Sequence, residues 1–258
     1  MTDVLVCVKR APDTGGDVTL TADGQSVDAR GLGFTISAHE SCAVELAVRI
    51  VAEDGGSVTV LSLGTQDAVE QLRSALGVGA NAAVLIEADD PAAFGPADVA
   101  REIAAVVEDG SYDLVLLGND AADTGDFQVG IRLAHLLGRP VVNGARTVEV
   151  ASQEGHAGGT ATAKVAGPDG VETYALPLPA VMTVLEGGVE PRYPSITGRM
   201  KAKKAKIETV APRAEPRGSG RVRLTLPPAQ PSTVEVLGEG PDAAPAVVDL
   251  LQRLGVMR

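Results

Sequence analysis

The chain has 258 residues, with 34 acidic and 22 basic side chains that give a formal net charge of −12. This balance argues against general nucleic-acid binding, which relies on cationic side chains at the phosphates, but it is compatible with a local basic surface for an acidic partner. Apolar residues make up 45% of the chain and aromatic residues only 2%, so we expect a core of Val, Leu, Ile and Ala. The length suits one large α/β domain, or one domain with an extension.

The two cysteines, Cys7 and Cys42, do not form a CxxC motif, so the sequence offers no cysteine-based metal or redox motif and suits a reducing cytosol. The N-terminal apolar run ends at Lys9 and is too short for a signal peptide. No run approaches the roughly 18 apolar residues that span a membrane. We therefore expect a cytoplasmic protein with no direct membrane insertion.

Strand-like and helix-like patterns alternate from the N-terminus to about residue 140. Such alternation is typical of a parallel sheet with helices on both faces, so the predicted fold class is a parallel, Rossmann-like α/β sheet. Asp23-Gly24, between two β-prone stretches, suggests a hairpin. Strands are predicted at Val4–Val8, Val58–Leu63, Ala82–Ile86 and Asp113–Leu117. Helices are predicted at His39–Ala52 after a Ser37 cap, around Ala68–Leu76 after a Thr65 cap, at Pro96–Val107 and at Phe127–Leu137.

The sequence after Arg139 is β-prone, with Gly-rich turns at Gly158-Gly159 and Asp169-Gly170 that predict an antiparallel hairpin. A returning strand, Ala180–Leu185, leads through a Pro- and Gly-punctuated loop to a Lys-rich turn or short helix. Beyond Pro212 the only predicted element is a helix at Ala244–Leu254. We expect an α/β domain over residues 1–210 and, over 211–258, an arm that cannot fold alone and either wanders or packs on another subunit.

The stretch "YDLVLLGNDAADTGDFQVG", residues 112–130, combines a strand, a loop rich in Gly and Asp, and the start of a helix. Ligands of doubly wound sheets lie beyond the carboxyl ends of the strands, where backbone N–H groups at a helix start can hold a phosphate without a cationic side chain. Gly118 and Gly125 would let the backbone approach an anion closely. The aspartates would then turn outward, cap turns or accept hydrogen bonds from ribose hydroxyls. An Asp-rich connector without a ligand explains the spacing equally well, and no P-loop or GxGxxG motif is present.

The run "RMKAKKAK", residues 199–206, is the only dense cationic patch in this acidic chain. A run of lysines is ordinarily a solvated surface. Here it follows a loop with an exposed-looking Ile196, and an apolar tip beside lysines is also typical of a docking site for an acidic partner.

The three histidines do not indicate a catalytic centre. His135 and His156 lie on a predicted helix surface and in a Gly-rich turn, and only His39 lies at the expected ligand edge of the sheet. GxSxG, HExxH and Cys–His arrangements are absent. We therefore predict a binding or electron-carrying subunit rather than an enzyme.

Five segments, in this order along the chain, are similar to one known family. They are "VLVCVKRAPD", "SAHESCAVELAVRI", "VLSLG…LRSALGVGAN", "YDLVLLGNDAADTGDFQVG" and "LPLPAVMTVLEGGVEPRYPSITGRMKAKKAKIE". Together they resemble the β subunit of electron transfer flavoproteins over most of residues 1–210, most specifically in the last segment. The tail beyond matches poorly in detail.

The resemblance implies a heterodimer with an FAD-binding α subunit, which takes electrons from flavin dehydrogenases such as acyl-CoA dehydrogenases and passes them to a membrane quinone oxidoreductase. It also implies a structural AMP in the β subunit and a recognition loop at about residues 185–206. Carried onto this chain, the AMP positions are Cys7, Ser37, Ala38, His39, Glu40, Leu63, Gly118, Asn119, Asp120, Ala121, Ala122, Asp123, Thr124, Gly125, Asp126, Phe127, Gln128 and Val129. The corresponding partner-docking positions are Glu190, Pro191, Arg192, Tyr193, Ile196, Lys201, Lys203 and Lys204.

The sequence departs from this family at two places. Ser37-Ala38-His39 replaces an Asn-Pro-aromatic helix entry, and Phe127 and Val129 replace an Asn and a Thr. Val129 removes a phosphate-binding hydroxyl, so either AMP binds more weakly or the pocket has changed its ligand, as in the bifurcating branch, where it holds a second FAD. His39 either tunes the flavin potential or is incidental.

Two readings compete with an electron-transfer subunit. The first is a free-standing nucleotide-binding regulatory protein of the same fold, which would need neither the recognition loop nor the long tail. The second, an adenylate-transferring enzyme, would need a phosphate-gripping loop after the first strand, and Gly15-Gly16 has poor spacing for one.

Overall fold

The computed structural model describes residues 1–258 except 14, 16–17, 152–158, 229–233 and 258. The chain forms two compact units, Met1–Leu224 and Thr225–Arg258, which are considered separately. His156 and Gly158, and hence the turn predicted at Gly158-Gly159, lie outside the described residues.

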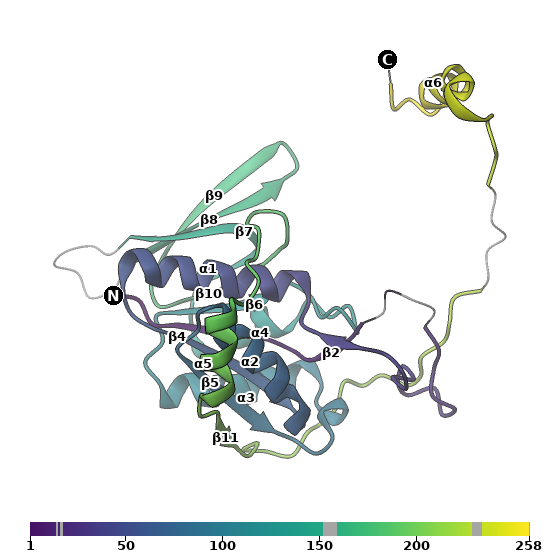
Figure 1. Cartoon of the computed structure of the whole chain (residues 1–258). Helices are drawn as coiled ribbons and strands as arrows, with labels where there is room; N and C mark the ends of the chain where they lie inside the picture. Colours follow the sequence, from purple (N-terminus) through teal and green to yellow (C-terminus); the bar gives the residue numbers. More distant parts are fainter. Residues whose placement is uncertain (14, 16–17, 152–158, 229–233, 258) are drawn as a thin grey trace. The chain divides into compact units, whose positions relative to one another are not determined.

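The first unit is built on a nine-stranded sheet, and the predicted α/β class is confirmed (Figure 1). Its strands pair in parallel from β11 to β7, and β7, β8 and β9 pair antiparallel at the other edge. β1 lies in the middle because its four residues are all buried and hydrogen-bond a neighbour on each side. In spatial order the strands are β11 (Glu208–Val210), β5 (Ala82–Glu87), β4 (Val58–Gly64), β1 (Val4–Cys7), β6 (Leu114–Gly118), β10 (Ala180–Val184), β7 (Val141–Ala151), β8 (Thr160–Gly167) and β9 (Gly170–Pro177).

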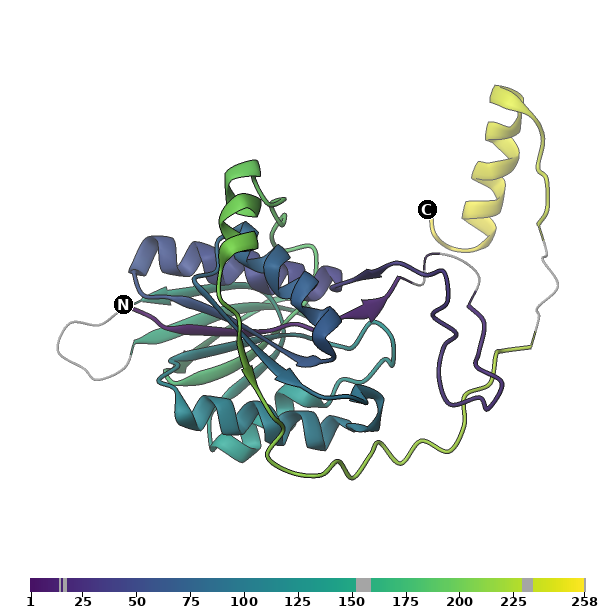
Figure 2. The same ribbon diagram turned by 60° about the horizontal axis from the view of Figure 1, so that its bottom comes forward.

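Helices cover both faces of the parallel sheet, as the sequence predicts (Figure 2). Because side chains alternate along a strand, Val4 and Val6 of β1 pack with one layer of helices while Leu5 and Cys7 pack with the other. The first layer contains α1 (Ala38–Asp54), α2 (Val69–Val78) and α5 (Ile196–Lys204), and the second contains α3 (Pro96–Asp109) and α4 (Val129–Leu137).

Local sequence signals set most of the helix ends. Ser37 caps α1 in a capping box, accepting the N–H of Glu40, whose carboxylate in turn accepts the N–H of Ser37. The prediction that Thr65 caps the next helix is wrong. Thr65 precedes the short 3₁₀ turn η1 (Gln66–Ala68), and its side chain makes no capping hydrogen bond. Asp169-Gly170 forms the predicted turn between β8 and β9.

Several elements differ from the prediction. α4 begins at Val129 rather than Phe127, because the preceding loop is closed by its own backbone hydrogen bonds, including Gly125 N–H to Ala121 O. Gly24 turns with a φ of +67°, but the hairpin around it is a single bridge, Leu20 to Val27. The short pair β2 (Ala11–Pro12) and β3 (Phe34–Thr35), the edge strand β11 and the turn η2 (Pro91–Ala93) were not anticipated.

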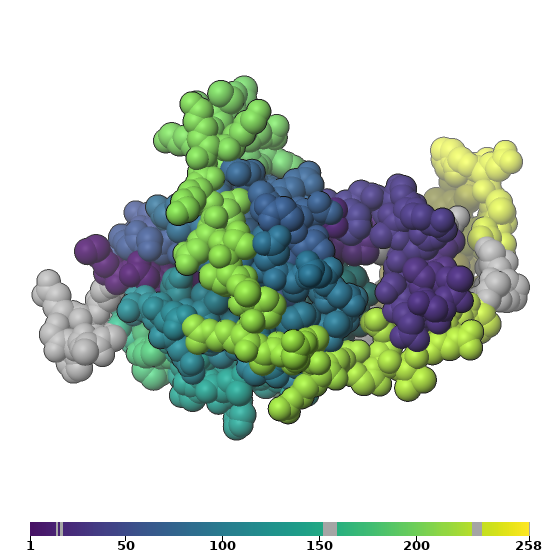
Figure 3. All heavy atoms as spheres, turned by 90° about the horizontal axis from the view of Figure 1, so that it is seen from below, coloured from purple at the N-terminus to yellow at the C-terminus, as the bar shows by residue number. Residues whose placement is uncertain are grey.

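Two buried carboxylates of α3 hold the connector that follows β11. Asp98 accepts the backbone N–H groups of Arg217 and Gly218, each at 2.9 Å, and Glu102 accepts that of Arg213 at 2.7 Å. Figure 3 shows this connector as a yellow-green strip across the surface of the first unit. The first unit therefore continues to Leu224.

The second unit consists of the turn η3 (Gly240–Ala243) and α6 (Ala244–Arg253), which confirms the predicted helix. No side chain of α6 is buried, and Val247 and Val248 are exposed on it. Within the described ranges, no helix combines the length and hydropathy needed to cross a bilayer.

Candidate functional site

A crevice is expected where β1 and β6 end, because the connections that leave these two neighbouring strands run to opposite faces of the sheet. From β1 the chain enters α1 on one face and returns through β4, whereas from β6 it enters α4 on the other face and returns on the far side. Such a switch point is where open α/β sheets bind ligands. The two strands pair in parallel with Cys7 opposite Leu117, so the polar residues that follow Cys7 and Gly118 lie at the same edge of the sheet.

Glu40 joins the segments on the β1 side of the crevice. Its carboxylate accepts the backbone N–H of Lys9 at 2.6 Å and that of Ser37 at 2.8 Å. Burial raises the pKa of Glu40 to about 7, although these hydrogen bonds oppose the rise. A Cβ on Gly118 would lie 2.9 Å from Cγ of Glu40, so glycine lets the end of β6 approach the start of α1.

The aspartates of the loop face other residues of the crevice. Asp120 Oδ1 lies 2.5 Å from His39 Nδ1, and Asp123 Oδ1 lies 2.7 Å from Lys9 Nζ. Asp126 accepts the Gln128 side-chain N–H at 3.2 Å. Two of the three carboxylates therefore connect the loop after β6 to the residues after β1 and to the first turn of α1.

A buried polar cluster fixes the far wall. Thr183 Oγ1 lies 2.7 Å from Asn119 Oδ1 and 2.8 Å from Asn143 Oδ1, and it accepts the N–H of Gly144 at 2.9 Å. A Cβ on Gly130 would lie 2.3 Å from Thr183 Cγ2, so the first turn of α4 packs directly on β10. The sequence analysis missed Thr183 and Asn143, because no motif connects them to the Asp loop.

The start of α4 carries backbone N–H groups that could hold an anion. The first N–H groups of a helix have no partner within it, and here they follow a loop with open space beside Gly125. Val129 is partly buried against the core and brings no hydroxyl. Gln128 is already engaged, because it donates to Asp126 and accepts from Arg132. Arg132, one turn into α4, is a cation near this helix start that was not among the predicted site residues.

The remaining predicted residues surround the same edge. Cys7 is buried at the end of β1, where burial first and Glu40 second raise the pKa of its thiol. Leu63 lies near the end of β4, the strand beside β1. Ala38 begins α1, and Ala121, Ala122, Thr124 and half-exposed Phe127 belong to the Asp loop. The fold thus brings both predicted segments, 37–40 and 118–129, to one edge.

The predicted docking segment, residues 190–204, lies beside α1 and α2. Arg192 donates twice to buried Glu45, at 2.7 Å each, so this arginine points into the body of the unit. Tyr193 and Ile196 are 90% and 83% exposed. Lys201, Lys203 and Lys204 are exposed as well and make no ion pair within the described part of the chain, and Glu190 and Pro191 lead into the segment.

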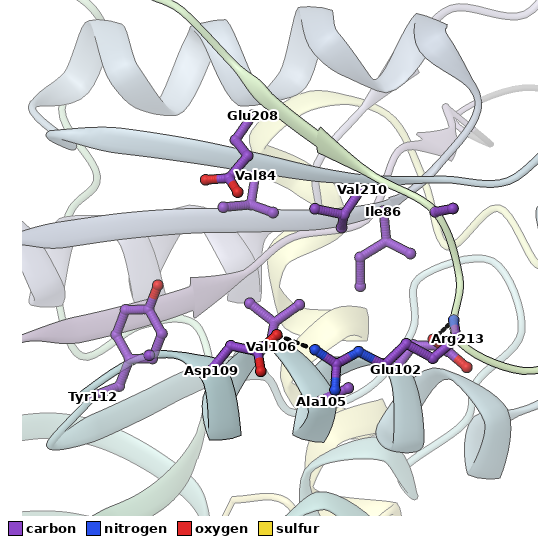
Figure 4. Close-up of a pocket in the computed structure, with 12 residues that line it drawn as sticks. Val84, Ile86, Glu102, Ala105, Val106, Asp109, Tyr112, Glu208, Val210 and Arg213 are labelled. Atoms are coloured by element: carbon purple, nitrogen blue, oxygen red, sulfur yellow. Dashed lines mark hydrogen bonds and ion pairs between the residues drawn. The ribbon is translucent and has the colours of Figure 1, made fainter.

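Two cavities lie outside the crevice. One, of about 200 Å³, lies between α3 and the strands β5 and β11 (Figure 4). It is walled by Val84, Ile86 and Val210, and the Arg213 side chain crosses it to pair with Asp109. The other, of about 360 Å³, lies between α2 and the docking segment. Among the described residues, His, Cys, Asp and Glu side chains nowhere gather in groups of three that could hold a metal ion.

Comparison with known proteins identifies the family. The family model of the electron transfer flavoprotein domain matches residues 26–215. The electron transfer flavoprotein subunit beta of Syntrophomonas wolfei is 34% identical over 92% of this chain and 90% of its own length. That of Bacillus subtilis is 30% identical over 97% of each chain, and that of Mycobacterium leprae is 36% identical over 80% of this chain and 78% of its own.

The chain belongs to the electron transfer flavoprotein β-subunit family. The resemblance found in the sequence is therefore confirmed, and the family supports a general role in electron transfer. The matched residues, 26–215, include the crevice residues from Ser37 onward and the whole docking segment.

Proposed function

We propose that this chain is the β subunit of a heterodimeric electron transfer flavoprotein that accepts electrons from flavin dehydrogenases, such as acyl-CoA dehydrogenases, and delivers them to a membrane quinone oxidoreductase. The α subunit binds most of the FAD, and this chain performs no bond chemistry of its own. The docking segment is the observation that carries the proposal. Ile196 stands exposed on it beside three unpaired lysines, an arrangement suited to a partner with an apolar pocket and an acidic rim.

The crevice is proposed to hold AMP in a structural role. Its phosphate would accept hydrogen bonds from the backbone N–H groups at the start of α4, where the helix dipole also favours an anion. Gly118 and Gly125 keep the backbone accessible, and exposed Phe127 offers an aromatic face for the base. AMP bound only by the folded chain would stabilise it by mass action.

The second unit is proposed to pack on the α subunit. Val247 and Val248 of α6 are each 40% exposed, and no side chain of this amphipathic helix is buried. Short segments that cannot bury their apolar side chains by themselves gain stability from a partner surface. A free-standing regulatory protein would have no use for this unit or for the docking segment.

Co-expression with the α subunit, followed by purification and identification of the released nucleotides, tests these assignments. One FAD and one AMP per heterodimer is the expected result. Two FAD molecules would instead make the chain a subunit of a bifurcating flavoprotein, with FAD in the crevice. A chain that binds neither an α subunit nor an adenine nucleotide would contradict the proposed function.

A further inference from the structure

The docking segment is in backbone contact with α2. A Cβ on Gly198 of α5 would lie 2.2 Å from the carbonyl oxygen of Gly77, and a Cβ on Gly77 would lie 3.0 Å from Cβ of Pro194. Real side chains do not tolerate the first distance, so α5 and α2 approach this closely only because both positions are glycine. Ala202 is buried one turn further along α5 and extends the contact.

Arg73 of α2 closes the C-terminal end of α5. Its Nη1 donates to the carbonyl oxygens of Ala202, Lys203 and Ala205, the last two at 3.0 and 3.3 Å. The last carbonyl groups of a helix lack hydrogen-bond donors within it and carry a partial negative charge. A guanidinium at this end supplies the donors and a compensating positive charge. Arg73 lies one turn before Gly77 on α2, so cap and backbone contact belong to one side of that helix.

The other end of the docking segment is fixed independently. Arg192 donates to both carboxylate oxygens of Glu45, and Arg49 donates to one of them at 2.6 Å. Burial by itself would raise the pKa of Glu45, but these hydrogen bonds, led by those of Arg192, lower it to about 2. Glu45 is therefore ionised at neutral pH, and the exposed tip lies between two charged attachments.

We propose that Arg73 is a positioning residue for electron-donor docking: by capping α5 against α2 it holds Ile196 in the geometry that the dehydrogenase recognises. This inference rests on the docking role proposed above. A segment ordered before the encounter avoids the entropy cost of being ordered during it, which strengthens binding without a new contact. Arg73 itself need not touch the dehydrogenase.

The test uses the full heterodimer with Arg73→Met and, as donor, an acyl-CoA dehydrogenase of the same organism reduced by its acyl-CoA substrate. We expect the donor concentration for half-saturation to rise about fivefold, the size expected for the loss of one hydrogen bond of ordinary strength. The limiting rate, the FAD content and the rate of flavin reduction by dithionite should equal those of the wild type. An effect on folding alone would instead lower the flavin content.

Arg199→Met is the matched control. Arg199 lies on the same surface as Arg73 but its side chain caps no carbonyl among the described residues, so this variant removes the same charge without the cap. Its effect on half-saturation should vanish at high salt, where exposed charges are screened. The effect of Arg73→Met should persist, because a displaced helix is not restored by salt.

Gly198→Ala provides a second route to the same displacement without changing any charge. Amide hydrogen exchange of the last turn of α5 should become about fivefold faster in Arg73→Met and in Gly198→Ala, and should be unchanged in Arg199→Met. Arg73→Lys, which keeps the charge on a shorter reach, replaces Arg73→Met if that variant does not assemble.

The outcomes separate the two proposals. If Ile196→Ala transfers electrons at the wild-type half-saturation, the docking role itself fails. If Ile196→Ala weakens transfer while the Arg73 and Gly198 variants keep both wild-type half-saturation and wild-type exchange, the docking role stands and the positioning role of Arg73 is overturned.

Discussion

The crevice and the docking segment use charge in opposite ways. In the crevice, Lys9 and His39 face Asp123 and Asp120, so two of the three loop carboxylates have a partner across the crevice. On the docking segment, Arg192 pairs with Glu45, and Arg73 of α2 donates to carbonyl groups at the end of α5, while Lys201 and Lys203 are left exposed. The difference teaches that a chain of net charge −12 still presents exposed lysines without an ion pair on the docking segment, where they are available to an acidic partner.

A second difference concerns the groups that hold a buried carboxylate. The charged group at the centre of the crevice, Glu40, is held by backbone N–H groups, and burial raises its pKa. The charged group beneath the docking segment, Glu45, is held by two guanidinium groups, and its pKa is lowered. The two carboxylates lie on the same helix, so they can be compared directly by titration.

The largest expected effect is on the pH dependence of stability through Glu40. An unfolded glutamate titrates near 4.5 and the folded one near 7, so between these values the folded chain retains a proton that the unfolded chain has lost. The free energy of unfolding should therefore fall by about 3 kcal/mol as the pH rises through this window. Urea unfolding of wild type and Glu40→Gln at pH 5 to 8 measures the difference.

Glu53→Gln, an exposed position near the end of the same helix, is the control and should leave the slope unchanged. A wild-type slope equal to that of Glu40→Gln would contradict the raised pKa.

The next effect concerns Glu45. Glu45→Gln removes the charge that Arg192 and Arg49 share, and we expect the heterodimer to lose about 2 kcal/mol of unfolding free energy, less than for a fully buried pair because both arginines are about half exposed. The stability contributed by the ionised Glu45 is present above the ordinary value near 4.5 and is lost as the pH falls toward 2. Unfolding at pH 7 and at pH 3 should therefore show a smaller difference between variant and wild type at pH 3. An equal difference at both would refute the pairing.

Ile196→Ala tests the exposed docking segment. The side chain is exposed and supports little of the core, so folding and flavin content should be unchanged. If it fills a pocket on the dehydrogenase, the kcat/KM for electron transfer should fall about tenfold, the size expected for an apolar interface residue. Val171→Ala, an exposed apolar position on β9, should leave transfer unaffected. Equal losses in the two variants would mean that Ile196 has no special role.

The elements that the sequence predicts well are those encoded by neighbouring residues. The strand β1 follows from four consecutive apolar residues, and the start of α1 follows from Ser37 and Glu40 three residues apart. Both signals depend only on a short window of the chain. The same holds for α6, whose apolar side chains recur at helical spacing.

The parts that the sequence does not predict depend on contacts between distant residues. Lys9 and Asp123 are 114 positions apart, and no local pattern indicates that they pair. The cap of α5 by Arg73 could not be foreseen because its acceptors are backbone carbonyl groups, which carry no side-chain signal. β11 has only three residues and forms because β5 offers a free edge beside it.

The smallest effect is expected for Lys9→Met, which removes the ion pair with Asp123 across the crevice. Lys9 is about half exposed, so the loss of unfolding free energy should stay below about 1 kcal/mol. The loop would nevertheless keep only the His39–Asp120 contact to the first turn of α1, and AMP should therefore dissociate about threefold faster. AMP retained by the heterodimer during timed dialysis measures this rate, with Lys201→Met on the docking segment as a charge-matched control. Retention equal to that of the control would show that the Lys9–Asp123 pair does not help to hold AMP in the crevice.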